Sequence, residues 1–239
     1  YVLLERIRAE KEELIKQGKI KRDKKESIIF RGDDNSYYEK VGDQRVCIDD
    51  DLSYSLPEGW VWCELQDCCI KEIKRGRSPK YADNGHVLSF AQKCNQKTGG
   101  INMGLALLID DSTACRYEDD EYLQDGDIVI NSTGTGTLGR VGIYRATDNL
   151  AGTPVVPDSH VTVVRVSSLL DPLYFFYCLK SMQSRLETLG EGSTNQKELK
   201  PLTVQQLRIP IPPIAEQNEI VKQIVALFGH LDAIATDLT

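Results

Sequence analysis

The C-terminal segment of the chain carries apolar residues at a helical spacing. It follows Pro212-Pro213, which cannot continue a sheet ladder and which stand just ahead of a helix start. The apolar steps alternate between four and three residues, and an average period of 3.5 is typical of a coiled-coil seam. We therefore expect a helix over residues 214–239 whose seam needs a partner. The seam residues are Ile220, Ile224, Leu227, Leu231, Ile234 and Leu238.

A second helix is predicted over residues 1–25, which contain no proline. Leu4, Ile7 and Leu14 lie on one side of this helix, and charged residues occupy most of the rest. We expect these three residues to pack against the C-terminal seam, so that the two helices form an antiparallel coiled coil. No capping residue precedes Tyr1. We interpret the chain as a fragment cut from a longer protein, with a natural processing site as the alternative.

Between the two helices the pattern predicts one globular domain over residues 56–213. Residues 26–55 hold few apolar residues and two Asp-rich turns, so we expect a linker there. Strands that mostly do not alternate with helices predict an α+β domain with a small, twisted and mostly antiparallel sheet. Asp171-Pro172 caps a helix expected over residues 173–189. The strands are expected at residues 87–90, 127–131, 141–145 and 161–166.

The composition fits one domain with helical arms. The chain has 239 residues, of which 41% are hydrophobic and 27% are charged. No apolar run is long enough to cross a bilayer, so we expect no membrane partner. Seven cysteines form an odd set without a C-x-x-C pair, and the three histidines are far apart. We therefore expect no metal site, and free thiols in a reducing compartment, the cytoplasm.

The net charge of −7 conceals one basic segment. Residues 71–80 contain five cations and one acid, a sum of +4, whereas residues 110–127 contain eight acids and one cation, a sum of −7. DNA affinity depends on the cations that reach phosphates on one face, not on the total charge. The basic segment is thus a candidate phosphate contact, with ordinary solvated surface as the alternative. Its cations are Lys71, Lys74, Arg75, Arg77 and Lys80.

Two loops rich in amide and amine groups are candidates for contacts with DNA bases. Asn and Gln side chains can bond adenine through two atoms, and Lys can reach guanine acceptors or phosphates. Plain solvated loops are the alternative. The candidates are Gln96 and Lys97 in the first loop and Asn195, Gln196 and Lys197 in the second.

Residues 134–139 have the spacing G-x-G-x-x-G, but their context argues against a dinucleotide site. Such a site needs a helix directly after the glycines, and residues 140–145 are instead β-rich and alternating. The glycines therefore predict a tight loop between two strands, which offers hydroxyl groups and one cation to DNA. These candidates are Ser132, Thr133, Thr135, Thr137 and Arg140.

The motifs that could indicate an enzyme are incomplete. Pro157-Asp158 resembles the start of a nuclease metal motif, but residues 161–166 supply neither the second carboxylate nor the lysine of such a site. Pro212-Pro213 lacks the preceding Asn or Asp of an adenine methyltransferase. We therefore expect no catalysis by this chain.

Five stretches occur along the chain in the order typical of one protein family. They are residues 4–11 (LERIRAEK), 56–60 (LPEGW), 126–131 (GDIVIN) and 192–199 (GSTNQKEL), and Pro212-Pro213 with Glu216-Gln217. Together these stretches resemble the specificity subunit of type I restriction–modification enzymes. In that family the subunit holds two target recognition domains on two long antiparallel helices, and each domain recognises half of a split DNA site. This chain has one such domain, and the order of its motifs resembles the second half of a subunit.

The resemblance implies sequence-specific recognition of double-stranded DNA by a non-catalytic chain without a cofactor. It also implies that methyltransferase (modification) subunits, which carry S-adenosylmethionine, dock on the helices. Restriction subunits that use ATP and Mg²⁺ would join through them. The unpaired seam also allows two half subunits to self-associate. The alternative is a coiled-coil scaffold that binds protein instead of DNA, which the acidic stretch favours.

Overall fold

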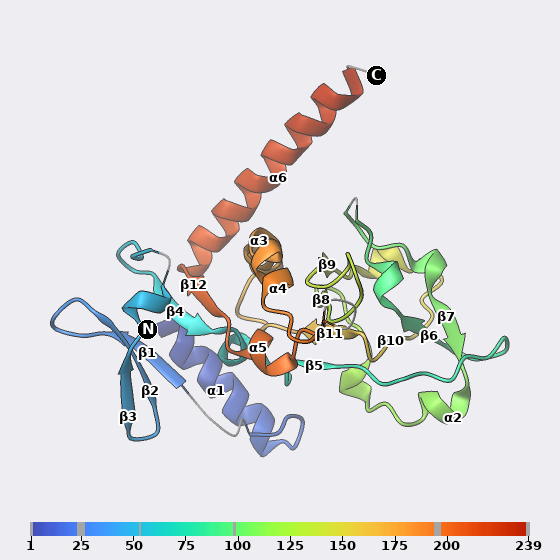
Figure 1. Cartoon of the computed structure of the whole chain (residues 1–239), viewed down its shortest axis with the longest axis horizontal. Helices are drawn as coiled ribbons and strands as arrows, with labels where there is room; N and C mark the ends of the chain where they lie inside the picture. Colours follow the sequence, from blue (N-terminus) through green and yellow to red (C-terminus); the bar gives the residue numbers. More distant parts are fainter. Residues whose placement is uncertain (1, 23–26, 53, 98, 194–196, 238–239) are drawn as a thin grey trace.

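The computed structural model describes residues 2–22, 27–52, 54–97, 99–193 and 197–237. Short strands and helices form a mixed body, and one long C-terminal helix projects from it (Figure 1). Within the described residues, no helix is both long and apolar enough to cross a membrane.

The N-terminal helix, α1 (Val2–Lys16), packs on this body. Leu4 and Ile7 are buried in the main hydrophobic core, and Glu10 accepts a hydrogen bond from the hydroxyl group of Ser167. The face of α1 that the sequence assigned to a helical partner is therefore in part used against the domain itself.

Helix α1 ends before residue 25, where the sequence placed its end. Gly18 has a φ of +70°, and the N–H groups of Gly18 and Lys19 bond to the carbonyl oxygens of Ile15 and Leu14. This pattern is a glycine-capped helix C-terminus. Residues 17–22 are therefore not helical, and residues 23–25 lie outside the described part of the chain.

Most of the segment predicted as a linker is a three-stranded antiparallel sheet, and that prediction was wrong in this respect. Its strands are β1 (Ser27–Arg31), β2 (Tyr37–Val41) and β3 (Gln44–Cys47). The Phe30 and Tyr38 rings stack 6.0 Å apart, and the guanidinium carbon of Arg45 lies 3.6 Å from the Tyr38 ring centroid. Aromatic and cation–π contacts thus stabilise the pairing of these strands. The strands lack the regular apolar–polar alternation from which a sheet is predicted.

Three further sheets form the predicted recognition domain. The first pairs β4 (Val61–Glu64) with β12 (Arg208–Ile211). The second has the order β5 (Lys74–Arg75), β11 (Val161–Val164), β8 (Ile128–Asn131), β9 (Val141–Ile143), and the third has the order β10 (Val155–Pro157), β6 (Val87–Phe90), β7 (Leu107–Ile109). Only the β10–β6 pairing among these strands is parallel. The mostly antiparallel α+β class is confirmed, in several small sheets rather than one.

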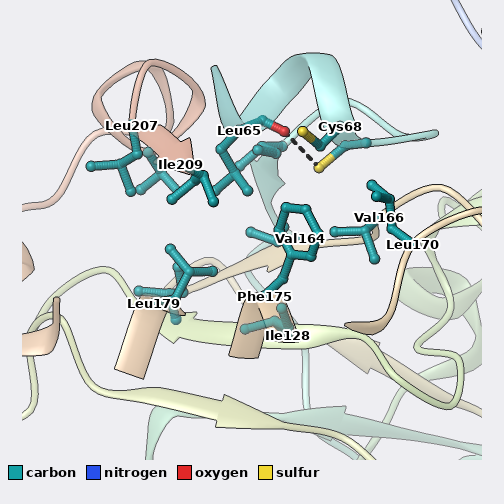
Figure 2. Packing of buried hydrophobic residues seen from close by; sticks show 14 of the residues in the cluster. Leu65, Cys68, Ile128, Val164, Val166, Leu170, Phe175, Leu179, Leu207 and Ile209 are labelled. Carbon is teal, nitrogen blue, oxygen red and sulfur yellow. Dashed lines mark hydrogen bonds between the residues drawn. The ribbon is translucent and has the colours of Figure 1, made fainter. Parts of the chain in front are cut away.

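The core lies where helices cover the β11–β8 sheet (Figure 2). Phe175 and Leu179 of α3 (Pro172–Ser181) are fully buried there, in one cluster with Ile128 of β8 and Val164 of β11. Asp171 caps α3 as the sequence predicted, since its carboxylate accepts from the Leu173 N–H. The other short helices are α2 (Asp111–Ala114), α4 (Gln183–Thr188) and α5 (Pro201–Gln205).

The helix predicted over residues 173–189 is therefore two helices, α3 and α4. Its backbone changes direction at Met182, where ψ is 4°. Helix α4 then approaches Gly139 closely, because a Cβ at that position would lie 2.7 Å from the backbone nitrogen of Glu187. Only glycine permits this approach at a φ of +75°.

The C-terminal helix, α6 (Ile214–Asp237), is anchored at its start. Trp60 donates its indole N–H to Glu216 at 2.5 Å. The buried Gln217 side chain accepts from the N–H of Asp171 and donates to the carbonyl oxygen of Pro212. The Glu216-Gln217 motif thus fixes the direction in which α6 leaves the domain.

Beyond these anchors α6 extends away from the body (Figure 1). Within the described residues of the two helices, the expected antiparallel coiled coil between α1 and α6 is not formed. The Phe228 ring stacks on Tyr177 of α3 at 6.2 Å, but Leu227, Leu231 and Ile234 are more than half exposed. Helix α1 leaves the root of α6 in another direction. Ile220 and Ile224 are half-buried, as is Leu14 on α1, and Leu238 lies outside the described residues.

A cluster of carboxylates joins the β1–β3 sheet to the domain. Arg208 donates to Glu39 of β2 at 2.8 Å and faces Glu64 in the β12–β4 register. Burial, together with the negative charges of Glu39 and Asp67, raises the pKa of Glu64 to about 7. Glu64 is thus a carboxyl group that the fold prefers in its neutral form.

This preference predicts that the protein loses stability as the pH rises from about 4.5 through about 7. The pKa of Glu64 is about 7 in the folded chain against a reference of 4.5, so its contribution is fully present below the reference value and lost as the pH rises through 7. We expect a loss on the order of 1–2 kcal/mol after solvent screening. Glu64→Gln should remove this part of the pH dependence in urea unfolding, and Glu219→Gln on exposed α6 should retain it. An unaltered profile in Glu64→Gln would contradict the assignment.

Candidate nucleic-acid interface

Three loops of the domain lie side by side. The first covers residues 91–102 after β6, the second covers residues 132–140 between β8 and β9, and the third covers residues 191–199. The N–H of Leu199 donates to the carbonyl oxygen of Ser132 at 2.8 Å, and Thr133 pairs with Glu198 in an isolated β-bridge. The structure thus brings together the three loops that the sequence nominated separately. Thr98, Asn195 and Gln196 lie outside the described residues.

Two buried asparagines connect the first loop to the second. Asn131 donates to the carbonyl oxygen of Gln92 at 3.1 Å. Asn95 donates to the Asn131 side chain at 3.3 Å and to the carbonyl oxygen of Arg140 at 3.0 Å. Asn95 and Asn131 are 1% and 0% exposed. Both amides are therefore hydrogen-bonded within the protein, which holds the two loops in one relative position.

Arg140 is part of the same network. Its guanidinium group donates to the carbonyl oxygen of Asn95 at 2.8 Å and to that of Gly136 at 3.1 Å. Thr137 donates to the Gln92 side chain at 3.2 Å. The sequence nominated Arg140 and Thr137 as DNA contacts, and the structure gives both an internal role that positions the loops.

The other hydroxyl candidates divide by exposure. Ser132 is fully buried and bonds to the Thr162 hydroxyl at 2.6 Å, so it is removed from the candidate DNA contacts. Thr135 is exposed at the tip of the second loop. Thr133 lies 2.8 Å from Nδ1 of His160, an exposed imidazole that the sequence analysis did not nominate.

The basic segment 71–80 is bound by the acidic stretch. The carboxylate of Glu121, whose side chain is 4% exposed, accepts from Lys74 and from Arg77, each at 2.9 Å. Burial alone would raise the pKa of Glu121, but hydrogen bonds from the Glu118 N–H, Lys74 and Arg77 outweigh it and lower the pKa to about 2. Lys80 pairs with Asp110 at 3.6 Å.

For Lys71, the structure differs most clearly from the expected phosphate contact. Its side chain is buried, its ammonium group donates to the carbonyl oxygen of Asp120 at 2.5 Å, and burial lowers its pKa to about 8. A phosphate contact would require Lys71 to leave this position. Arg75 pairs with Glu198 at 2.6 Å and so connects β5 to the third loop. DNA contacts by Lys74, Arg75, Arg77 and Lys80 stay predictions.

The exposed cations at the loops are lysines. Lys97 and Lys197 were nominated from the sequence, and Lys93 was not; all three are exposed and form no ion pair within the described residues. Gln96 donates to the carbonyl oxygen of Lys93 at 2.6 Å, which leaves its amide oxygen available. Lys93 could have been found from its spacing to Lys97, whereas nothing in the sequence distinguishes Asn95 or Asn131.

The chemistry of the described residues is that of a binding surface. Within them, no group of three or more His, Cys, Asp or Glu residues is placed to hold a metal ion. The seven cysteines are free thiols, and burial raises the pKa of Cys94 near the first loop and of Cys178 on α3. The arrangement offers amide, hydroxyl, imidazole and ammonium groups on a rigid framework.

Similarity to known proteins identifies the family of this chain. The family model for the type I restriction modification DNA specificity domain matches residues 57–238, so the chain belongs to this family. Its members are the non-catalytic DNA-recognition components of type I restriction–modification systems, and this chain is a specificity-subunit chain with one target recognition domain.

Individual proteins similar to this chain are also specificity subunits. The chain is 27% identical over 236 residues to the type I restriction enzyme EcoEI specificity subunit of Escherichia coli, covering 92% of this chain and 33% of that protein. The HsdS subunit from Thermoanaerobacter tengcongensis has a similar fold, with a TM-score of 0.58, 18% identity, and coverage of 78% of this chain and 42% of that one.

A second solved chain, from work on complex assembly and conformational transition of the type I R-M system, gives a TM-score of 0.59 at 19% identity. The similarity covers 76% of this chain and 41% of that chain. The chain thus spans about a third of its curated relative and about two fifths of the solved chains.

The asparagine network predicts a specific effect of Asn131→Ala. The change leaves the Gln92 carbonyl and the Asn95 amide without their buried partner, which should cost about 1–3 kcal/mol of stability. Hydrogen exchange should accelerate at residues 92–97 and 133–140. Asn149→Ala, which removes a bond to the Thr153 carbonyl outside the network, is the matched control and should leave both loops unchanged. Equal exchange in the two variants would refute the network.

Proposed function

We propose that this chain recognises one half of a bipartite sequence in double-stranded DNA. The observation that carries the proposal is the convergence of three loops with exposed Lys93, Lys97 and Lys197 above the asparagine framework. Lysines on one face bind phosphates, whereas amide and hydroxyl groups at fixed positions distinguish bases. Membership of the family supports DNA as the ligand, and the three loops are the surface that we propose to contact it.

Charge pairing within the domain supports the same assignment. The acids of residues 110–121 pair with cations of residues 71–80, so those two segments largely neutralise each other. The lysines of the first and third loops, Lys93, Lys97 and Lys197, are exposed to solvent. A DNA duplex responds to this local field more than to the net charge of −7.

The second part of the proposal concerns the projecting helix α6, which we assign to docking of partner subunits. We assign the exposed Leu227, Leu231 and Ile234 of α6 to a helical seam that docks methyltransferase subunits or the matching helix of a second half subunit. In this scheme S-adenosylmethionine belongs to the methyltransferase subunits, and ATP and Mg²⁺ belong to restriction subunits joined through them. The seven free thiols suit a reducing cytoplasm.

The DNA proposal predicts a steep salt dependence carried by the loop lysines. A duplex selected from a randomised pool should bind the full chain with an affinity that falls as salt rises. Replacing Lys93 and Lys97 by Ala together should flatten the slope of log affinity against log salt by about 1–2 units. Fluorescence anisotropy at four salt concentrations measures the slope.

Two variants control this experiment. Lys40→Ala removes an exposed cation of β2 in the separate β1–β3 sheet, and Lys71→Met removes the buried ammonium group. Both should keep the slope of the parent chain. A chain that binds no pool sequence, or binds without salt dependence, would support the scaffold function instead.

The docking proposal predicts that Leu227→Asp weakens association through α6. Burying a leucine contributes about 1.5–3 kcal/mol, so a charge in the seam should reduce capture of a methyltransferase subunit about tenfold or more. Ala233→Asp adds the same charge to the same helix away from the seam and serves as the matched control. DNA binding by the loops should survive both changes. Full methyltransferase binding by Leu227→Asp would exclude this seam as the docking site.

A further inference from the structure

A turn between β10 and β11 lies directly beside the second loop. It covers residues 158–160, and its backbone is joined to that loop because the N–H of Ser132 donates to the carbonyl oxygen of His160 at 2.8 Å. The DNA contacts predicted from the sequence do not include this turn. It adds to the candidate nucleic-acid interface one exposed imidazole, that of His160.

The backbone of this turn is fixed from inside the domain. Asp158 is 3% exposed, and its carboxylate accepts from the N–H of His160 at 2.8 Å. The N–H of Asp158 donates to the carbonyl oxygen of Phe90 at 3.1 Å, and its own carbonyl oxygen accepts from the N–H of Val161 at 3.2 Å. An aspartate that bonds the backbone two residues further on stabilises a turn. His160 is thus held through both its N–H and its carbonyl oxygen.

The ring of His160 is fixed as well. Its Nδ1 lies 2.8 Å from the hydroxyl oxygen of Thr133, and a hydroxyl group can donate to a bare ring nitrogen or accept from a protonated one. The other ring nitrogen, Nε2, has no partner among the described residues. When Thr133 donates to Nδ1, the neutral ring carries its proton on Nε2. His160 then offers one oriented N–H donor at the surface.

The other two histidines of the chain lie away from the three loops. His86 comes just before β6, at the end of that strand opposite to the first loop, and its Nδ1 pairs with the Asp111 carboxylate at 3.1 Å. His230 lies on the projecting helix α6. Both residues are exposed. They provide imidazoles of the same chain with which His160 can be compared.

A single donor held in place suits a base edge better than a phosphate. Phosphate contacts depend on charge and carry no sequence information, so flexible lysine side chains serve them well. Base edges in the major groove are distinguished by the positions of their donors and acceptors, among them the acceptor N7 of the purines. A contact of this kind requires a donor whose position is fixed by its own supporting hydrogen bonds. The ring of His160 meets this requirement.

We propose that His160 distinguishes one base pair of the target through its Nε2–H, and that Thr133 positions the ring for this contact. The inference rests on the proposed DNA recognition and adds the β10–β11 turn to the three loops. It also gives Thr133, which the sequence nominated as a DNA contact, a role through His160.

Discrimination at single base pairs tests this inference. The full chain selects a duplex from a randomised pool, and each base pair of that duplex is then replaced in turn. In His160→Ala, discrimination at one base pair should fall about three- to tenfold, the effect of one lost hydrogen bond. Affinity for scrambled DNA and the salt slope should stay as in the parent chain. Fluorescence anisotropy measures each affinity.

Further variants separate a base contact from a structural role. The amide nitrogen of Gln reaches the place of Nε2, whereas that of Asn lies nearer to the place of Nδ1. His160→Gln should therefore retain part of the discrimination, and His160→Asn should lose it. Thr133→Val should reduce discrimination at the same base pair, because the ring is no longer held. His86→Ala removes an exposed ring outside the interface and should leave discrimination unchanged at every base pair.

Three results would overturn the inference. An equal loss of affinity for all duplexes in His160→Ala, with a flatter salt slope, would place His160 on a phosphate. Unchanged discrimination at every base pair in His160→Ala would remove His160 from the recognition surface, while DNA recognition by the chain itself would stand. A parent chain that selects no sequence from the pool would overturn both this inference and the proposed function on which it rests.

Discussion

The pairing of β4 with β12 is the constraint on which the rest of the molecule depends. It joins the first strand of the recognition domain to the last, across more than half of the chain. Trp60 before β4 bonds to Glu216 after β12, and Gln217 continues the contact to Asp171 at the start of α3. This closure fixes the root of α6 beside the core that also receives α1. The helix can therefore project into solvent while its first turns stay anchored.

Charge is distributed by the fold rather than by the sequence order. Two carboxylates of the acidic stretch form internal ion pairs. Glu121 pairs with Lys74 and Arg77, and Asp127 pairs with the buried Arg165. These pairs contribute little to the electric field outside the protein, because the fields of two opposite charges so close together largely cancel at a distant phosphate. A chain with a net charge of −7 can then still present the exposed Lys93, Lys97 and Lys197 at its loops. The two acids of the third loop, Glu191 and Glu198, are paired with Lys200 and Arg75. The sign of the local surface, not the sum, decides how DNA approaches.

Buried polar groups fix the first and second loops in one position relative to each other. An apolar core would stabilise the region equally well, but it would hold the loops less specifically than directional hydrogen bonds do. Asn95, Asn131 and Arg140 bind one another and the backbone of both loops. Recognition of bases needs donors and acceptors fixed to a fraction of an ångström. The network thus connects packing in the interior to the proposed readout at the surface.

The sequence determined the elements whose signals are local. Strands near residues 87–90 and 161–164, the Asp171 cap and the helix after Pro212-Pro213 all follow from spacing and turn residues, and the motifs defined the family. Tertiary structure alone decided that residues 27–47 form a sheet, that Lys71 is buried, and that the loop near Asn95 meets the loop near Asn131. Ion pairs, aromatic stacks and buried amides join residues far apart in the chain. Their energy depends on distances in space that no local pattern encodes.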